Sequence, residues 1–199
     1  MSERRHNFLW LDLETTGLDP HKCHILEWAA VLAEDDREGD MSPVEQFSGV
    51  IGFDADRVIL NDNADVVDVP GVDPFVVKMH IENGLWEECV FSEDNTLEEA
   101  DEFLAGLCER LGGKTNPGSI VLAGSTVHFD LGFVRVHMPR FAAYLSHRCF
   151  DVSTLKMAER DWAGEKFKKA EAHRALPDVL ESLEHAAEIR AKIDRWAAK

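Results

Sequence analysis

The chain has 199 residues, of which 45% are hydrophobic and 30% charged, a composition typical of a globular domain. This length is enough for one domain with its own core, and no apolar run is long enough to be a transmembrane helix. Acidic residues outnumber basic ones by 38 to 21, and the net charge of −17 disfavours capture of long polyanions such as nucleic acids. It remains compatible with a protein that binds no nucleic acid, or with one that holds a short piece through metal ions in a tight pocket.

The cysteines and the first residues bear on the cellular location. Cys23, Cys89, Cys108 and Cys149 are scattered and form no Cys-x-x-Cys pair, which disfavours a zinc knuckle or a disulfide framework. Residues 1–7 lack the apolar segment of a signal peptide. We therefore expect a reducing compartment, a cytoplasmic location and no membrane partner.

Hydrophobic patterning predicts three strands in the first quarter of the chain. The apolar run Phe8–Leu11 is typical of a buried strand, and Ile25–Ala33 and Val44–Ile51 are predicted to be the second and third strands. The acidic segment Glu34–Asp40 is expected to form the loop between the second and third strands. The segment Asp54–Asp73 mixes Asn, Asp and Val, and is expected to be an irregular excursion.

Helices and short strands are predicted to alternate in the rest of the chain. Pro74 can begin a helix that runs toward Gly84, and Thr96–Glu99 is a capping box for the next one. The later elements are a strand over Ile120–Gly124, a helix from about Thr126 to Pro139, a helical piece over Arg140–Leu145, a short strand at Cys149–Phe150, a helix begun by Asp151–Thr154, and a last helix from about Ala175. This order predicts a mixed α/β sheet flanked by helices, in a single domain over 1–199 with a core of about 7–188.

Two carboxylates lie together at the end of the first predicted strand. Asp12 and Glu14 are two residues apart, so their side chains point to the same face, and Thr15-Thr16-Gly17 follows as a turn signal. Because adjacent carboxylates repel, one pKa of an uncompensated pair is raised, and a hard divalent cation such as Mg²⁺ relieves the repulsion. For this pair alone, an exposed acidic strand end without a metal is the alternative.

Three more titratable residues occur in informative positions further along the chain. Asp130 lies in a very apolar segment, where a carboxylate needs a partner or a metal; Arg135 or a helix N-terminus could also satisfy it. Asp178 begins the last predicted helix, where acids are common because of the helix dipole. His173, five residues earlier, could equally be a loop histidine of no catalytic significance.

Taken together, Asp12-x-Glu14, Asp130 and His173-x-x-x-x-Asp178 resemble, in order and local context, the DEDDh exonucleases. This is the proofreading-type superfamily, whose fold is ribonuclease-H-like. Three further stretches resemble the oligoribonucleases within that superfamily: Trp10–Leu18, Met79–Leu85 and Asp151–Lys156. The resemblance extends from about Phe8 to about Glu188.

The resemblance implies a metal-dependent 3′→5′ exoribonuclease that converts short single-stranded oligoribonucleotides to nucleoside 5′-monophosphates and often forms a homodimer. It implies that two divalent ions, Mg²⁺ or Mn²⁺, are bound by Asp12, Glu14, Asp130 and Asp178, with His173 as the general base. It also implies substrate contacts by six residues: Thr15, Thr16, Gly17, Leu18, His80 and Ser125.

Two alternatives remain at this point. Thr15 and the stretch Val127–Phe133 are closer to the proofreading pattern, which favours a 3′→5′ exonuclease acting on single-stranded DNA. A module that kept the fold but lost catalysis is the other alternative, and it is disfavoured because all five expected catalytic residues are present.

Overall fold

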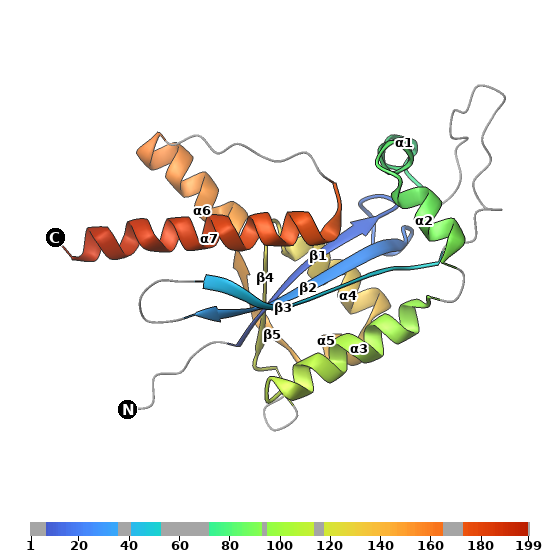
Figure 1. Cartoon of the computed structure of the whole chain (residues 1–199), viewed down its shortest axis with the longest axis horizontal. Helices are drawn as coiled ribbons and strands as arrows, with labels where there is room; N and C mark the ends of the chain where they lie inside the picture. The colour runs from blue at the N-terminus through green and yellow to red at the C-terminus, as the bar shows by residue number, and fades with distance from the viewer. Residues whose placement is uncertain are drawn as a thin grey trace.

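A computed structural model describes residues 7–35, 41–52, 72–92, 95–113, 118–164 and 173–198. Five strands form one sheet in the order β3-β2-β1-β4-β5 (Figure 1). β1 pairs antiparallel with β2, and β2 pairs antiparallel with β3, whereas β1 and β5 both run parallel to β4. The strands are β1 Asn7–Thr15, β2 Ile25–Asp35, β3 Met41–Val50, β4 Ile120–Gly124 and β5 Leu145–Asp151. The predicted mixed sheet is therefore confirmed.

Helices cover both faces of this sheet, and Figure 1 shows α7 on one side and α3, α4 and α5 on the other. Their bounds are α1 Pro74–Glu82, α2 Leu85–Phe91, α3 Leu97–Arg110, α4 His128–His137, α5 Pro139–Ala142, α6 Val152–Ala158 and α7 Ala175–Ala197. A wider helical turn over Glu159–Ala163 follows α6 directly. In the part of the chain that the structure describes, no helix is both long and apolar enough to cross a membrane.

The alternation of side chains along β1 decides which face carries the candidate site. Leu9, Leu11 and Leu13 belong to the core cluster that packs against α3 and α4. Trp10 belongs instead to the cluster with Val179 and other residues of α7. Because side chains alternate along a strand, Asp12 and Glu14 lie on the same face as Trp10. The first turn of α7 packs against this face.

Several local predictions are confirmed by hydrogen bonds. The Thr96 hydroxyl accepts from the Glu99 backbone while the Glu99 carboxylate accepts from the Thr96 N–H, as the capping box requires. The Asp151 carboxylate accepts from the Ser153 N–H at the start of α6. The predicted strand Ile120–Gly124 has the observed bounds of β4, and the last helix begins at Ala175 as predicted.

Other bounds were predicted wrongly. The helical piece expected over Arg140–Leu145 ends at Ala142, and the short strand expected at Cys149–Phe150 runs over Leu145–Asp151. The longer strand arises from pairing with β4, which joins Leu145 to Ile120 and which local patterning does not reveal. The helix α2 was not predicted, and nearly all of the excursion expected over 54–73 lies outside the described residues.

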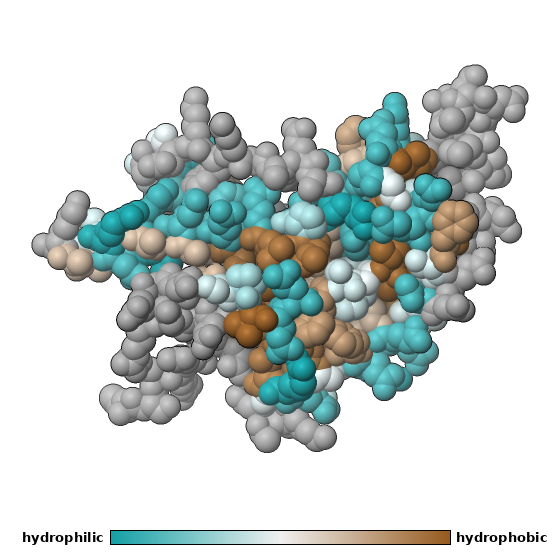
Figure 2. All heavy atoms as spheres, in the orientation of Figure 1, coloured by the Kyte–Doolittle hydropathy of each residue, from teal (hydrophilic) through white to brown (hydrophobic). Residues whose placement is uncertain are grey.

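Figure 2 shows hydrophobic surface between α7 and α3, over the edge strand β3, where Val44 is 60% exposed.

All four cysteines are free thiols; Cys149 is exposed, and the other three are buried. Burial raises the pKa of Cys89 and of Cys108 to about 12, so neither forms a thiolate at neutral pH.

Candidate active site

Three carboxylates converge where the end of β1 meets the start of α7. Asp12, Glu14 and Asp178 each place one oxygen within 4.8 Å of the others, and all three side chains are partly exposed. β1 carries the first two, whereas Asp178 lies in the first turn of α7. An all-oxygen, strongly anionic group of this kind fits a hard divalent cation. The predicted pairing of Asp12 with Glu14 thus extends to an acid 164 positions further along the chain.

Asp130 lies in the first turn of α4 and is only 3% exposed. Its Oδ1 accepts the N–H of Leu13 at 3.0 Å. The burial of this carboxylate is therefore not explained by Arg135 or by a helix N-terminus alone. Since Leu13 stands between Asp12 and Glu14, this bond holds Asp130 against the same strand. Among the described residues, the 4.8 Å group does not include Asp130. Burial raises the pKa of Asp130 to about 8, so a nearby cation would greatly favour its charged form.

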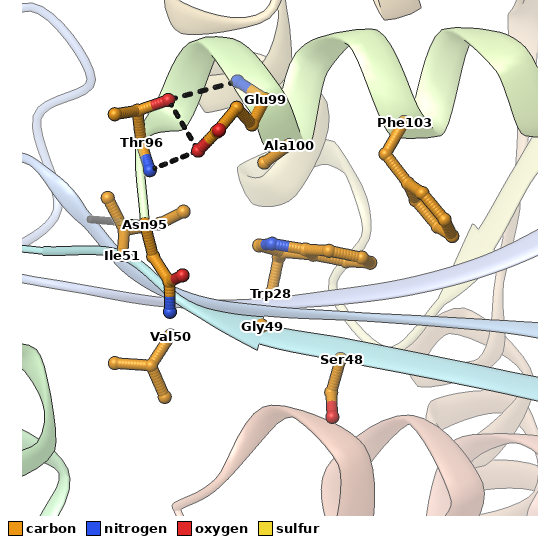
Figure 3. Close-up of a pocket in the computed structure, with 10 residues that line it drawn as sticks. All are labelled: Trp28, Ser48, Gly49, Val50, Ile51, Asn95, Thr96, Glu99, Ala100 and Phe103. Atoms are coloured by element: carbon orange, nitrogen blue, oxygen red, sulfur yellow. Dashed lines mark hydrogen bonds between the residues drawn. The ribbon is translucent and has the colours of Figure 1, made fainter. Parts of the chain in front are cut away.

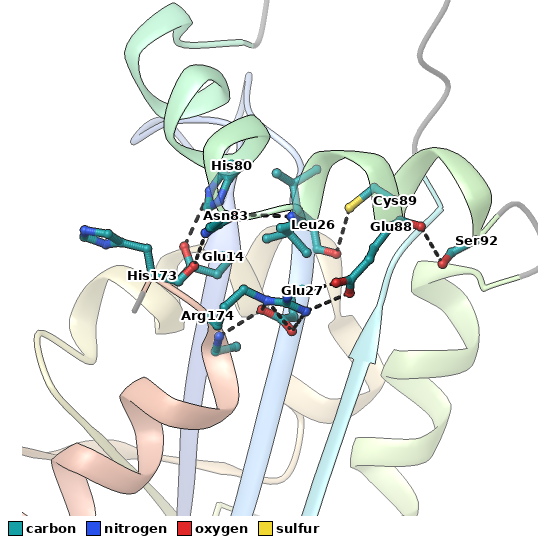
Figure 4. A network of polar contacts seen from close by, with 12 residues as sticks. Glu14, Leu26, Glu27, His80, Asn83, Glu88, Cys89, Ser92, His173 and Arg174 are labelled. Atoms are coloured by element: carbon teal, nitrogen blue, oxygen red, sulfur yellow. Dashed lines mark hydrogen bonds and ion pairs between the residues drawn. The ribbon is translucent and has the colours of Figure 1, made fainter. Parts of the chain in front are cut away.

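His173 directly precedes Arg174, which occupies the N-cap position of α7, and the His173 backbone has a φ of +46°. This left-handed conformation is uncommon for a residue other than glycine. The carbonyl oxygen of His173 accepts a 2.7 Å hydrogen bond from Nδ2 of Asn83, which lies between α1 and α2 (Figure 4). The backbone of the predicted base is therefore hydrogen-bonded to the residue that follows α1, the helix that carries His80.

His80 faces the carboxylates from the interior of the protein. Its side chain is fully buried, and its Nε2 lies 3.5 Å from Oε2 of Glu14. Burial lowers the pKa of His80 to about 4, so the imidazole is neutral at pH 7. A neutral ring beside Glu14 leaves the negative charge of the carboxylate group undiminished.

The turn after β1 is held by its own hydrogen bond and by close packing. The Thr15 hydroxyl donates to the carbonyl oxygen of Gly17 at 2.8 Å. Thr16 is fully buried, and a Cβ on Gly17 would lie 2.8 Å from Sγ of Cys23. Leu18, by contrast, is 76% exposed. The turn therefore presents one large apolar side chain to solvent from a tightly packed base.

Ser125 follows β4 and contacts α7. Its Oγ is 2.9 Å from Oγ of Ser182, which also hydrogen-bonds to the carbonyl oxygen of Asp178 at 3.0 Å. Ser125 thus reaches the helix one turn after the third carboxylate of the group.

A second set of polar residues, which was not predicted from the sequence, supports this site. Glu27 of β2 is 5% exposed, and Arg174 contacts both it and Glu88 of α2. The available signal was a single acid within the apolar run Ile25–Ala33, since a buried carboxylate requires a partner. Its partner, Arg174, is 147 positions away and could not be identified from local sequence.

A similar arrangement next to Asp130 was also missed. The Asp151 carboxylate accepts from the Thr126 N–H at 3.0 Å in addition to its bond from Ser153. Thr126 has a φ of +57° and lies in the turn that leads into α4. Asp151, which was predicted only as a cap for α6, therefore also stabilises the turn that leads into α4, the helix that carries Asp130.

A pocket of about 320 Å³ lies on the opposite face of the sheet (Figure 3). Trp28, next to Glu27 in β2, points into it, and the Trp28 and Phe103 rings are 5.5 Å apart. Among its described lining residues Glu99 is the one acid, and its carboxylate is occupied by the Thr96 cap. This pocket offers no group of titratable side chains and is separate from the carboxylates.

Comparison with protein families and curated relatives identifies the chain. The exonuclease family model RNase_T matches residues 9–185. A probable oligoribonuclease of Dictyostelium discoideum is 33% identical over 195 residues, 97% of this chain and 93% of the relative. An oligoribonuclease of Francisella tularensis is 28% identical over 94% of this chain and 96% of its own length. A probable oligoribonuclease of Schizosaccharomyces pombe is 30% identical over 92% of this chain and 67% of its own.

Solved structures support the fold. Escherichia coli exonuclease I, solved with single-stranded DNA, aligns with a TM-score of 0.60 and 17% identity over 94% of this chain. Exonuclease I of Methylocaldum szegediense gives the same TM-score over 92% of this chain. The chain spans about two fifths of those proteins, 41% and 40% respectively. At such identity the likeness shows the fold alone, and it confirms the predicted ribonuclease-H-like architecture.

The exonuclease family depends on divalent metals, and the oxygens of Asp12, Glu14 and Asp178 are suitable ligands for one. The family match covers most of the chain, and a curated relative above 30% identity is aligned over nearly its whole length. The chain therefore belongs to the exonuclease family and is a 3′–5′ exonuclease of the oligoribonuclease group.

Proposed function

We propose that this protein removes nucleotides from the 3′ end of short single-stranded oligoribonucleotides and releases nucleoside 5′-monophosphates. The convergence of Asp12, Glu14 and Asp178, with Asp130 held against the same strand, is the observation that carries this proposal. The oligoribonuclease names of its relatives support the substrate class. The net charge of −17 favours short substrates, because it opposes binding of a long polyanion.

The four acids would hold two Mg²⁺ or Mn²⁺ ions. Their donor atoms are all carboxylate oxygens, and the buried Asp130 carboxyl is a group whose negative charge needs a cation. When bound, such ions lower the pKa of a water molecule and stabilise negative charge on the leaving 3′-oxygen. Asp12, Glu14, Asp130 and Asp178 then serve both as ligands and as catalytic residues.

His173 would act as the general base. An imidazole accepts a proton readily near neutral pH, so it suits removal of a proton from the attacking water. The water oxygen attacks the phosphorus of the terminal phosphodiester, and the bond to the 3′-oxygen of the preceding nucleotide breaks. Placement of this base depends on the left-handed backbone at His173 and on its bond to Asn83.

The substrate contacts remain predictions. The exposed Leu18 would pack against a base, while Thr15, Thr16 and Gly17 would line the terminal nucleotide. Ser125 lies near the start of α7 and would contact the substrate there, and His80 would contact it beside Glu14. Kinetics of variants at these positions with substrates of different length test these contacts.

One experiment tests the substrate class. A 5′-labelled RNA dinucleotide, an RNA pentanucleotide and a DNA of matched sequence are incubated with enzyme in Mn²⁺ or in chelator. Rapid, chelator-sensitive loss of the RNA dinucleotide is the expected result. Preference for DNA would instead support the alternative of a single-stranded DNA exonuclease. No cleavage in Mn²⁺, together with no stabilisation by Mn²⁺, would support a non-catalytic module.

We further propose that the chain is a single domain that forms a homodimer in the cytoplasm. The dimer is supported by large apolar side chains left in solvent, including Trp162 at 87% and Trp196 at 79% exposed. Light scattering of the purified protein tests it: a mass of about twice 22.4 kDa is expected. A mass near 22.4 kDa would contradict the proposal.

A further inference from the structure

Arg174 links three elements of the structure at the edge of the candidate site. Its Nε and Nη2 donate to Oε1 of Glu27 on β2, at 3.2 and 2.9 Å. Its Nη1 and Nη2 also donate to the two carboxylate oxygens of Glu88 on α2, at 3.0 and 2.7 Å (Figure 4). A planar guanidinium can donate paired hydrogen bonds to both carboxylates at once, whereas an ammonium group cannot. The residue is therefore held on two sides by charged hydrogen bonds.

Glu27 also determines where α7 begins. Its Oε2 accepts the backbone N–H of Ala175, the first residue of α7, at 2.9 Å. The residue at the N-cap position, Arg174, provides no side-chain cap of its own. A buried carboxylate from β2 thus satisfies a free N–H at the positive end of the helix. Nε of Arg174 donates to the same oxygen at 3.1 Å, but the donor from Ala175 is a backbone N–H, so this bond is expected to remain if Arg174 is replaced.

The backbone at His173 is held from the other side by Asn83. Its Nδ2 donates to the His173 carbonyl, while its Oδ1 accepts from the N–H of Leu85 at the start of α2. Arg174 itself has extended backbone angles, φ −136° and ψ 135°. The imidazole of His173 and the guanidinium of Arg174 point apart in Figure 4. The bonds of Arg174 on one side and of Asn83 on the other therefore fix the backbone from which the imidazole projects.

We propose that Arg174 is a positioning residue for the reaction. Its bonds to Glu27 and Glu88 hold the left-handed backbone of His173, and so aim the imidazole at the proton it removes. This inference rests on the proposed general-base role of His173. Misplacement of a reacting group by about 1 Å can cost about 100-fold in rate. Loss of the bonds from Arg174 to Glu27 and Glu88 is therefore expected to lower kcat and to leave KM nearly unchanged.

Steady-state kinetics on a labelled RNA dinucleotide in Mn²⁺ test the proposal with three variants. Arg174→Lys keeps the positive charge but loses the planar, forked set of N–H donors, and is expected to lower kcat about 3- to 10-fold. Arg174→Met is expected to lower it about 10- to 100-fold. Glu88→Gln removes the ion pair between Arg174 and the half-exposed Glu88 carboxylate, and is expected to lower kcat about threefold in a folded protein. It keeps the test decisive if Arg174→Met does not fold.

A matched control comes from an arginine that also bridges two acids. Arg140 contacts Glu98 and Glu102 of α3 at 3.2 and 3.3 Å, on the opposite face of the sheet. Arg140→Met is expected to leave kcat unchanged. Calorimetry of Mn²⁺ binding is expected to give affinities within about threefold of wild type for Arg174→Lys, because the Glu27 bond to Ala175 holds α7 and Asp178. Loss of Mn²⁺ binding would overturn the proposal in favour of general disruption of the site.

The decisive measurement is the effect of Arg174→Lys with and without His173. In the His173→Ala background, Arg174→Lys is expected to change kcat less than about twofold, because both changes act through one imidazole. An equal loss in both backgrounds would overturn the inference, as would wild-type kcat in folded Arg174→Met and Glu88→Gln. If His173→Ala alone kept wild-type kcat, the proposed general base would fail, and the positioning role with it.

Discussion

The backbone N–H of Leu13 donates to Oδ1 of Asp130 at 3.0 Å, across 117 positions of sequence. Leu13 itself points into the core, so the bond uses a backbone group that side-chain patterning does not register. It places a buried acid of α4 beside the strand that carries Asp12 and Glu14. The proposed metal ligands thus come from three elements that are joined by backbone as well as side-chain contacts.

Asp130→Asn tests the charge at this position separately from its shape. The amide oxygen can still accept from Leu13, so the metal-free variant is expected to be at least as stable as wild type, because a buried carboxylate is costly. Thermal unfolding in chelator and in Mn²⁺ is the measurement. Wild type is expected to gain Tm with Mn²⁺ and the variant to gain little, with turnover lowered at least about 100-fold. Equal gains in both proteins would remove Asp130 from the ligand set.

Asp12→Ala is expected to abolish chelator-sensitive turnover and to leave the fold intact, since this side chain is only partly buried and lies outside the apolar core. Circular dichroism and turnover of the RNA dinucleotide check the two parts. Asp19→Ala is the matched control, because Asp19 lies in the following turn, where it pairs with Lys22 at 3.0 Å. Wild-type turnover in clean Asp12→Ala protein would rule out the assigned metal centre.

His173→Ala is expected to lower kcat about 100-fold or more, in the range of general-base contributions. The folded protein is expected to retain Mn²⁺ binding, since the imidazole is not among the proposed ligands. His21→Ala, at an exposed position in the turn after β1, is the control and is expected to turn over normally. A change confined to KM would instead indicate that His173 binds substrate.

How much of this was predictable depends on the distance over which each feature acts. The Thr96 cap, the β4 bounds and the shared face of Asp12 and Glu14 follow from residues within four positions of one another. The extent of β5 and the pairing of Glu27 with Arg174 depend on partners at least 25 positions away. Local sequence therefore predicted the cap, the strand bounds and the shared face of two acids, but not the contacts between distant elements that hold these features in place.

His185 of α7 makes stability depend on pH. Burial lowers its pKa, as does Lys156, while Glu181, Glu184 and Glu188 oppose the shift. The unfolded chain then takes up a proton before the folded protein does, so stability falls as pH drops below about 6.5. Urea unfolding of wild type and His185→Gln at pH 7.5 and 5.5 measures this. The variant is expected to lose less stability over that interval, and an equal loss would exclude His185 as a contributor.

Gly17→Ala tests the packing beneath Leu18. The new Cβ would lie 2.8 Å from Sγ of Cys23 and 3.3 Å from Cβ of Asp73, so a buried side chain must move. Overpacking of this kind is expected to cost about 1–3 kcal/mol in the free energy of unfolding. Because Cys23→Ala removes the nearer atom, the double variant is expected to lose less than the sum of the single losses, by about 0.5 kcal/mol or more. Strict additivity would mean that the turn moves away from Cys23 as a whole, and KM for the RNA dinucleotide would then rise in Gly17→Ala.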